Sequence, residues 1–554
     1  MSVTESQIRP GAYYDSVVLM QLQRNLLKLP GVEDAGVVMA TPANLELLAD
    51  SDLLSAEVKG ANPDDLLIVV RAAAADDAAA ALDQVDALLK QRQSMAVGTF
   101  RTRGLAAAAK SLPAAQWVLI SVPGRYAAKV ADEALEFGKH VFLYSDNVTL
   151  EEEVKLKRKA SQKNLLVMGP DCGTASINGI GLGFANRVRR GSIGLVAASG
   201  TGLQAVSAGI HNLGGGVSQA IGTGGRDLKA EVGASTMLQG LRYLAADVDT
   251  KVIVLISKPP DEETASNLLA AAHRAGKPVV VDFIGFAPPA AQIGSVYFAA
   301  GLDQAARLAV ELAKLPAVIK VAARSSQGYL RGLFSGGTLA YEVLSGLQLF
   351  LSPLYSNLPV RPSQELANPL NSQGHTILDL GEDEFTVGRL HPMIDNDLRL
   401  RRMKQEAGDP DVGLILLDVV LGEGAHPDPA SELAPAIAAH RKARLDLEFV
   451  ALVIGTDEDP QQIDEQIKQL TKAGATVFRQ VAATVDYVAS KLAKAPSSTA
   501  AVAKFAEPLA AINVGVESFY ESLKAQGAEA VQVDWRPPAA GNEDLMSILE
   551  KMKA

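Results

Sequence analysis

The sequence predicts an α/β protein built from several doubly wound parallel-sheet domains, preceded by a small α+β domain. Short apolar runs such as 117–122, 251–256 and 449–454 recur along the chain, each followed by a turn and a helical pattern. These runs are almost continuously apolar, which is typical of parallel strands that helices cover on both faces. Hydrophobic residues make up 48% of the 554 residues and aromatic residues only 5%, so the cores must consist mainly of Ala, Val, Leu and Ile.

Composition and charge narrow the functional classes. The formal net charge of −11 argues against a nucleic-acid surface and supports solubility. A single cysteine, Cys172, excludes an intrachain disulfide and a thiolate metal site, and no His-Glu-x-x-His pattern is present, so we expect no metal. The first residues lack the basic and apolar segments of a signal peptide, and the apolar runs are too short to span a bilayer. We therefore expect a cytoplasmic protein that binds neither nucleic acid nor a membrane.

Residues 1–100 are predicted to form the small α+β domain. A helix is expected at 17–29, strands at 35–39 and 65–70, and an Ala-rich helix at 75–91. Strands and helices that alternate over so short a span favour a small α+β sandwich.

Three further segments repeat a strand–turn–helix pattern, and each is predicted to form a parallel-sheet domain. The segment 101–190 carries strands at 117–122, 140–144 and 165–168, with a helix at 127–138. The segment 191–318 carries strands at 192–197, 217–221, 251–256 and 277–282. The segment 319–495 carries strands at 412–417, 449–454 and 475–478.

The remaining residues, 496–554, are predicted to be a C-terminal extension. A Pro- and Ser-containing linker at 495–500 leads into it, and apolar runs follow at 511–514 and 531–535. Trp535 is interpreted as an anchoring core residue, with an interface role as the alternative.

Two glycine-rich turns, at 198–202 and 221–227, are the strongest functional signal. Each follows a predicted strand, and the first leads directly into a helical pattern. Such turns leave backbone N–H groups free at the carboxyl edge of a sheet, where the helix dipole favours a phosphate or a carboxylate. Similar turns follow other strands at 123–125, 169–174 and 257–260. The candidate substrate- and phosphate-binding residues are Gly169, Pro170, Asp171, Cys172, Gly173, Thr174, Ser199, Gly200, Thr201, Gly202, Gly222, Gly224, Gly225 and Lys258.

Charged side chains in these turns have two interpretations each. The planar fork of Arg226 matches two oxygens of a phosphate or carboxylate, but it could equally form a salt bridge with Asp227 or Glu231. Lys258 is either a point charge for phosphate or a solvated lysine. Cys172 is either a nucleophile or, as a small cysteine in a turn, a packing residue.

Two histidines lie in loops beside carboxylates. His391 follows Arg389 in the segment 388–395, and His426 lies in the segment 422–428. Either histidine could act as a general acid or base or could orient an anion, whereas His-Pro is also simple turn chemistry. Arg226, Arg389 and His391 are the catalytic candidates.

These motifs resemble a known family. The segments 122–126, 168–174, 198–202, 222–227 and 257–260 resemble the α subunit of succinyl-CoA synthetase, and residues 330–490 resemble the C-terminal ligase domain of its β subunit. Over nearly its full length the chain is identified as a member of the FdrA family, from the segments 41–44, 145–150, 169–174, 224–228, 386–395 and 537–542. The resemblance implies a Rossmann-like CoA-binding-type domain at 101–190 and two flavodoxin-like ligase-type domains at 191–318 and 319–495.

The chain departs from the synthetase pattern at three places. The segment 283–301 carries no histidine where the synthetase has a phosphorylated one, no glycine-rich turn precedes Trp117, and residues 1–100 are too short for an ATP-grasp segment. A phosphohistidine relay needs such a nucleophile.

The FdrA resemblance implies a subunit of an oxamate carbamoyltransferase in allantoin and purine catabolism, working with two partner subunits. The reaction is oxalurate plus phosphate giving oxamate plus carbamoyl phosphate, or the reverse, and it needs no cofactor. The alternative is a subunit of an ADP-forming acyl-CoA synthetase, which uses CoA and ATP. A third possibility is a non-catalytic scaffold that binds CoA or an acyl phosphate.

Overall fold

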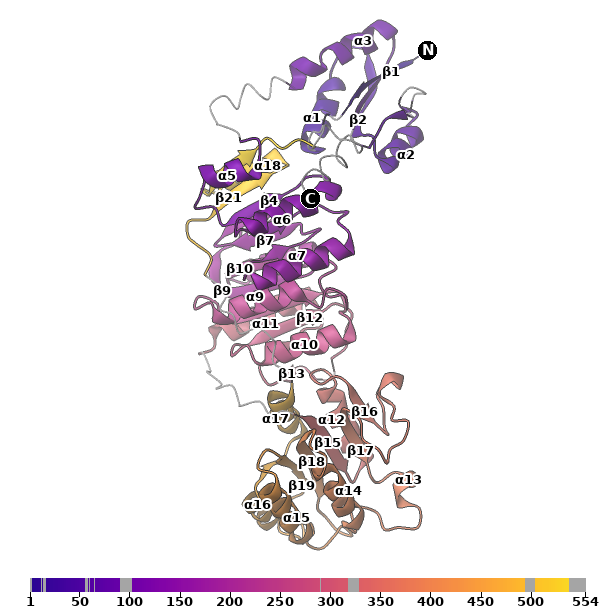
Figure 1. The fold of residues 1–554 in the computed structure, drawn as a ribbon, viewed down its shortest axis with the longest axis vertical. Helices are drawn as coiled ribbons and strands as arrows, with labels where there is room; N and C mark the ends of the chain where they lie inside the picture. Colours follow the sequence, from indigo (N-terminus) through magenta and orange to yellow (C-terminus); the bar gives the residue numbers. More distant parts are fainter. Residues whose placement is uncertain are drawn as a thin grey trace. The chain divides into compact units, whose positions relative to one another are not determined.

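The structure of the chain is a computed structural model. It describes residues 2–10, 12, 16–54, 58, 60–63, 65–89, 102–288, 290–316, 328–493 and 504–537. The expected linker at 495–500 and residues 538–542 lie outside the described residues. The chain divides into two compact units: unit 1 comprises Met1–Gly173, Ile180–Phe184 and Phe505–Ala554, and unit 2 comprises Thr174–Gly179 and Ala185–Lys504. Several of the sheets are parallel, which confirms the predicted α/β class (Figure 1). No helix in the described part of the chain is both long and apolar enough to cross a membrane.

Unit 1 begins with the small α+β domain. Its antiparallel sheet has the strand order β1-β3-β2, from β1 (Val3–Arg9), β2 (Val32–Met39) and β3 (Leu66–Ala72). Alternate residues of β3 face opposite sides, so Leu66 and Ile68 pack under α1 (Ser16–Leu26) and α3 (Ala75–Asp83). Leu67 packs instead with Leu48 of α2 (Pro42–Asp50) on the other face. Because both faces are covered, β3 is buried at every residue except Arg71.

A five-stranded parallel sheet forms the rest of unit 1. Its order is β22-β21-β4-β5-β6, from β4 (Trp117–Ile120), β5 (His140–Leu143), β6 (Val167–Met168), β21 (Ala510–Val514) and β22 (Glu529–Val533). The helices are α5 (Leu105–Ser111), α6 (Gly124–Glu136), α7 (Leu150–Gln162) and α18 (Glu517–Ala525). The short strand β8 (Ile180–Gly183) contacts α18, where the Gly181 N–H donates to Gln526 Oε1 at 2.7 Å.

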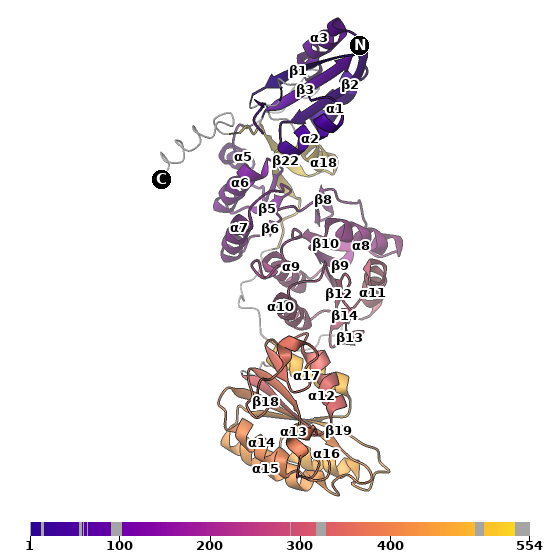
Figure 2. The same cartoon turned by 90° about the vertical axis from the view of Figure 1, so that its right-hand side faces the viewer.

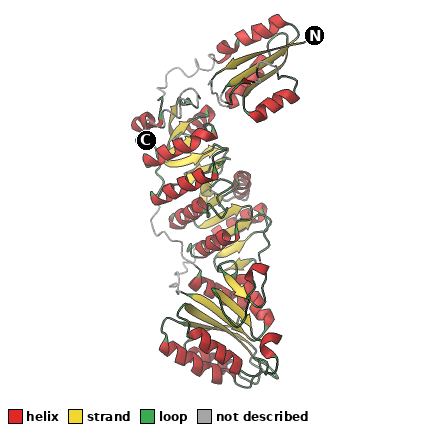
Figure 3. Ribbon diagram, turned by 45° about the vertical axis from the view of Figure 1, so that its right-hand side comes forward, coloured by secondary structure: helices red, strands yellow, loops and turns green. Residues whose placement is uncertain are grey.

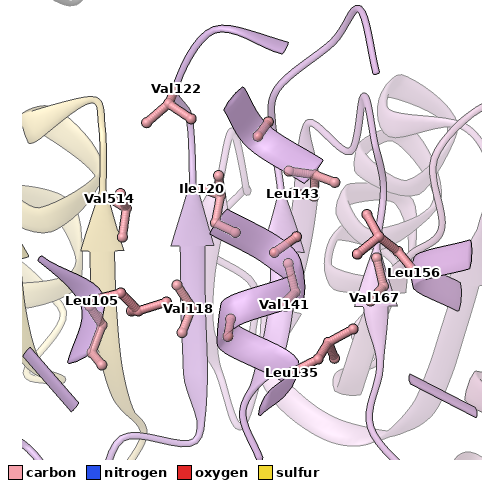
Figure 4. Close-up of a cluster of buried hydrophobic side chains, with 14 of the residues drawn as sticks. Leu105, Val118, Ile120, Val122, Leu135, Val141, Leu143, Leu156, Val167 and Val514 are labelled. Atoms are coloured by element: carbon pink, nitrogen blue, oxygen red, sulfur yellow. The ribbon is translucent and has the colours of Figure 1, made fainter. Parts of the chain in front are cut away.

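The C-terminal residues correct the predicted domain plan. They were expected to form an extension after the last sheet, but β21 pairs in parallel with β4, with Val514 opposite Ile120. Figure 4 shows Val514 beside Val118 and Ile120 in one apolar cluster. Trp535 packs against this cluster, 5.4 Å from the ring of Tyr126, as expected of a core anchor. The prediction failed because an apolar run indicates a strand but not the sheet that the strand joins.

The first sheet of unit 2 is flavodoxin-like. Its parallel strands follow the order β14-β12-β11-β9-β10, which is the 2-1-3-4-5 winding of flavodoxin read from the other edge. They are β9 (Arg190–Ala197), β10 (Val217–Gly222), β11 (Val252–Ser257), β12 (Val279–Phe283) and β14 (Val296–Phe298). Antiparallel strands β7 (Thr174–Ile177) and β13 (Gln292–Ile293) pair with β10 and β14. Figure 2 shows α8 (Gly200–Asn212) and α11 (Leu302–Lys314) on one face, and α9 (Ser235–Ala246) and α10 (Glu262–His273) on the other.

The second sheet of unit 2 is parallel throughout (Figure 3). Its order is β16-β17-β15-β18-β19-β20, from β15 (Tyr329–Phe334), β16 (Leu354–Ser356), β17 (His375–Asp379), β18 (Val412–Val420), β19 (Glu448–Ile454) and β20 (Ala475–Phe478). Helices α12 (Gly337–Leu347) and α17 (Val481–Leu492) pack together, while α14 (Asp397–Ala407), α15 (Pro429–Ala443) and α16 (Ile463–Lys472) cover the core on the other side. A short helix, α13 (Asp383–Thr386), follows β17.

Candidate anion-binding site

Three of the predicted turns lie at one edge of the first sheet of unit 2. Residues 199–202 follow β9, residues 222–225 end β10, and Lys258 follows β11. Strand β9 is hydrogen-bonded to both β10 and β11, and all three strands are parallel, so their carboxyl ends meet. The strand order reverses at β9, which is where doubly wound sheets bind their ligands.

The turn after β9 forms the start of α8. Ser199 is the N-cap, and its Oγ accepts a hydrogen bond from the Gly202 N–H at 3.1 Å. Among described residues, the Gly200 and Thr201 N–H groups have no hydrogen-bond partner. Thr174 also reaches this turn, because its Oγ1 lies 3.6 Å from the point that a Cβ on Gly200 would occupy. Free N–H groups at the positive end of a helix suit an oxyanion.

Asp227 joins the turn after β10 to the start of α9. Its fully buried carboxylate accepts hydrogen bonds from the Thr236 and Met237 N–H groups, at 3.1 and 2.9 Å, and so caps α9. Gly224 has φ +82, a conformation that favours glycine. Arg226 is half-buried in the same turn, and Lys258 is exposed with no hydrogen-bond partner for its ammonium among the described residues.

The predicted turn at 169–174 is divided between the two units. Thr174 belongs to unit 2, whereas residues 169–173 belong to unit 1. A Cβ on Gly169, which has φ +114, would lie 2.2 Å from Leu143 O, so this position requires glycine. Cys172 is buried, and its N–H donates to the same Leu143 oxygen at 3.2 Å. The structure therefore fixes this turn on the end of β5, and burial of Cys172 favours the packing interpretation.

Unit 1 has its own crevice at the carboxyl ends of β4, β5 and β21. A cavity of about 560 Å³ is lined there by residues that include Ser121, Pro123, Tyr144, Asp146, Asp171 and Val516, together with side chains of α1 and β2. Burial raises the pKa of Tyr144, and the nearby carboxylates of Asp146 and Asp171 raise it further.

One wall of this crevice was not predicted from the sequence. No glycine-rich turn precedes Trp117, but Gly515 supplies a glycine turn from the C-terminal residues. Gly515 has φ +125, and a Cβ there would lie 2.5 Å from Ser121 Oγ, which also accepts the Val516 N–H at 2.7 Å. The available signal was the glycine directly after the apolar run 511–514.

Arg389 and His391 are not brought together with these turns, because they belong to the second sheet of unit 2. Arg389 is exposed, and His391 is partly buried with its Nδ1 accepting the Met393 N–H at 3.2 Å. The neutral ring then carries its proton on Nε2. A Cβ on Gly381 would lie 2.8 Å from this Nε2 and 3.0 Å from Asp379 Oδ1.

Asp379 lies in the segment 378–381, within the stretch that resembles the ligase domain, but it was not among the predicted site residues. Its pKa is raised, chiefly by burial and also by the charges of Glu382 and Asp418, while the Gly381 N–H and His391 act in the opposite direction. His426, the other candidate histidine, lies 3.4 Å from Glu432 Oε1 and accepts the Asp428 N–H through Nδ1.

A second cavity lies between the two domains of unit 2. It has a volume of about 630 Å³ and is lined by Ala290, Gln292, Ile293, Gly337, Thr338, Tyr341, Glu342, Ser345, Gly346, Leu358, Val481, Ala482 and Val485. Two ion pairs tie α10 to the other domain, His273 Nε2 to Asp486 Oδ1 at 2.7 Å and Glu262 to Arg361 at 2.5 Å.

Comparison with known proteins matches two segments of the chain to family models. Residues 1–103 match the AllF heavy metal-associated domain, and residues 333–490 match the CoA-ligase family. The YahF protein of Escherichia coli (strain K12), which is described as uncharacterised, is 41% identical over 487 residues, covering 84% of this chain and 94% of that protein. Subunit alpha 2 of the ADP-forming succinate–CoA ligase of Archaeoglobus fulgidus is 28% identical over 183 residues, covering 32% of this chain and 61% of that subunit. A solved acetyl-coenzyme A synthetase 1 of Ca. Korarchaeum cryptofilum is 17% identical, with a TM-score of 0.29 over 68% of this chain and 82% of its own.

The residues of the N-terminal domain do not fit the heavy metal that the name of the first family implies. Soft metal ions are bound by thiolate and imidazole ligands, and residues 1–103 contain neither cysteine nor histidine. In the described part of the chain, no three His, Cys, Asp or Glu residues are grouped so that they could hold a metal ion.

Proposed function

Because the chain belongs to the FdrA family of succinyl-CoA synthetase-like proteins, we propose that it is the subunit of an acyl-CoA synthetase-like enzyme that binds the phosphate group of an acyl phosphate. The observation that carries this proposal is the meeting of three polar turns on the neighbouring strands β10, β9 and β11. The free N–H groups of Gly200 and Thr201 would donate to phosphate oxygens, and Arg226 and Lys258 would supply positive charge.

The crevice of unit 1 supports the same function. It lies where β21 and β4 meet at the carboxyl ends of a doubly wound sheet, the usual position for a nucleotide-like ligand such as CoA. Close backbone approach requires glycine at two positions there: a Cβ on Gly124 would lie 2.2 Å from Asp146 O, and Gly515 meets Ser121. ATP would be bound by the ATP-grasp domain of a partner subunit.

The test is ATP-dependent thioester formation by the full chain with its nucleotide-binding partner. We expect Arg226→Ala and Lys258→Ala each to lower kcat/KM by about tenfold to a hundredfold, since each removes a charge-assisted contact with phosphate. Lys251→Ala is the matched control, because Lys251 is an exposed lysine at the opposite end of β11. No thioester, or equal rates for all three variants, would refute the proposal.

A second candidate is the subunit of an oxamate carbamoyltransferase, which one specific observation favours. The segment 283–301 between β12 and α11 carries no histidine, so it offers no phosphoryl carrier of the synthetase type. In this reaction a phosphate oxygen attacks the ureido carbonyl carbon of oxalurate, the bond from that carbon to the oxamate nitrogen breaks, and the nitrogen takes up a proton. Phosphate would occupy the turns around Arg226, and the ureido carbon of oxalurate must lie beside it, so His391 and Arg389, which follow a strand of the other sheet, would not touch the reacting atoms.

Carbamoyl phosphate formation from oxalurate and phosphate distinguishes the two candidates. The full chain is combined with both partner subunits, without ATP or CoA, and carbamoyl phosphate is measured directly. Product that is lost in Arg226→Ala would support carbamoyl transfer. Its absence, together with an acid-labile phosphoryl group from labelled ATP, would support the synthetase. Full activity of the partners alone would leave this chain as a scaffold.

A further inference from the structure

Asp282 lies in the row of residues that precedes the phosphate turns of unit 2. In the parallel sheet it lies opposite Ile256 of β11, and Ile256 lies opposite Ala197 of β9. Residues that lie opposite one another in a sheet project to the same face. Ser199 follows shortly after Ala197, and Lys258 follows shortly after Ile256. The carboxyl group of Asp282 therefore belongs to the last row of side chains before these turns.

The face to which Asp282 projects is the one that α8 covers. Val280, on the same strand, packs in one apolar cluster with Leu203 of α8, and alternate residues of a strand face the same side. The first turn of α8 lies on the neighbour of Asp282 in the row, because a Cβ on Gly202 would be 3.2 Å from Ile256 Cγ2. The free N–H groups of this turn and the carboxylate thus stand over adjoining residues of one face.

No described residue gives the Asp282 carboxylate a partner. The side chain is 1% exposed, and its Oδ2 accepts no hydrogen bond within the described part of the chain. No described lysine or arginine forms an ion pair with it either. A buried carboxylate without hydrogen bonds or a counter-charge is costly, and an aliphatic residue would fill the same place without that cost. The unused acceptor therefore points to a donor that a ligand supplies.

The phosphate turns themselves supply only hydrogen-bond donors and positive charge. Gly200 and Thr201 offer N–H groups, and Arg226 and Lys258 are cations. Such groups hold any oxyanion by its unprotonated oxygens. A carboxylate acts in the opposite way, because it only accepts hydrogen bonds and repels an anion that has no proton to donate. Beside these donors, Asp282 favours an oxyanion that keeps one O–H group.

We propose that Asp282 accepts a hydrogen bond from the P–OH group of inorganic phosphate bound at these turns, so that the site selects the monohydrogen form of the anion. This inference rests on the proposed phosphate site and adds the protonation state of its ligand. Sulfate has the same tetrahedral shape and the same charge as monohydrogen phosphate but carries no proton. Inorganic phosphate is a reactant or a product of both candidate reactions, so the role of Asp282 is the same in each.

Isothermal titration of the full chain with inorganic phosphate and with sulfate, at about pH 8, tests the inference, because both anions are then dianions and carboxyl groups are ionised. We expect phosphate to bind at least about tenfold more tightly than sulfate, since one hydrogen bond to a charged group is gained and repulsion of sulfate is avoided. Equal affinity would overturn the role of Asp282 and leave the phosphate site in place, because the donors of the turns hold both anions. If neither anion binds, the phosphate site itself is wrong, and the role of Asp282 falls with it.

Variants assign the selectivity to one side chain. Asp282→Asn keeps the size of the side chain but adds an N–H donor, so we expect the preference for phosphate to fall to within about twofold, mainly because sulfate binds more tightly. Asp282→Ser, whose hydroxyl donates or accepts, gives the same test with a smaller side chain. Asp303→Asn changes an exposed carboxylate in the first turn of α11 and is the matched control, which should keep the preference. A folded Asp282→Asn or Asp282→Ser protein that still prefers phosphate tenfold would overturn the proposal.

Discussion

Asp282 has a buried carboxylate, one oxygen of which accepts no hydrogen bond from the described residues. It lies at the end of β12, is 1% exposed, and its Oδ2 has no hydrogen-bond partner among the residues that the structure describes. Burial raises its pKa, so the folded state holds this proton more tightly than the unfolded chain does. The free energy of unfolding therefore falls as the pH rises through the range between the ordinary pKa of aspartate and the raised pKa of Asp282.

Asp282→Asn should remove this pH dependence, because asparagine resembles the protonated acid. At pH 7 we expect the variant to be more stable by roughly 1 kcal/mol, the order of cost for one unsatisfied buried polar group. The gain should shrink toward about pH 3, where the wild-type carboxyl is protonated in both states. Thermal unfolding of both proteins at the two pH values measures the difference, and a variant that is less stable at pH 7 would contradict it.

At the scale of elements, two helix starts next to the phosphate turns are capped unequally. Ser199 gives α8 one hydrogen bond, whereas the buried carboxylate of Asp227 gives α9 two. Ser199→Ala should lower the free energy of unfolding by about 1 kcal/mol, as is usual for the loss of an N-cap side chain. Asp227→Ala should cost more, about 2 to 3 kcal/mol, because it also leaves buried N–H groups unpaired. Denaturant unfolding of the two variants gives the ranking, and a larger loss for Ser199→Ala would contradict it.

The same scale shows what apolar patterns can predict. The parallel strands β9, β11 and β19 were predicted to within about two residues because their runs are almost continuously apolar. Strand β20 was also predicted, although it is only partly buried. Strand β15 was not predicted, since Arg331 interrupts its run. That arginine is 2% exposed and is neutralised by Glu406 at 2.6 Å and Asp409 at 3.1 Å, residues that lie far along the chain. A sequence pattern cannot show that a charged residue will be buried in a strand when its stabilising partners lie so far along the chain.

At the scale of the whole molecule, the sequence predicts candidate sites whose residues follow neighbouring strands. It does not predict candidate sites whose residues come from segments that are far apart in the chain. The turns around Ser199 and Arg226 meet because β9 and β10 are consecutive and paired. The wall of the unit 1 crevice was not predicted because Ser121 and Gly515 lie far apart in the sequence, and only the fold sets them together. Arg389 and His391 were grouped with the phosphate turns by motif alone, and the fold places them on another sheet.

The C-terminal segment gives the sharpest test at this scale. Strands β21 and β22 complete the parallel sheet of unit 1, and Ile512 and Val514 are buried in the same cluster as Val118 and Ile120. Deleting residues 505–554 exposes the edge of β4 and removes these side chains. We expect a loss of several kcal/mol, since burial of one such side chain contributes about 1.5 to 3 kcal/mol. Unit 1 should then lose its cooperative unfolding transition and become sensitive to protease.

Deleting only residues 538–554 is the matched control, because it leaves both strands and Trp535 in place. A separate peptide of residues 505–537, added to the shortened chain, should restore protease resistance, since the sheet needs the strand and not its covalent connection. If the chain lacking residues 505–554 unfolds at the same temperature as the full chain, the C-terminal residues do not hold this sheet together. In that case the C-terminal residues would not build the wall of the crevice that is proposed to bind CoA.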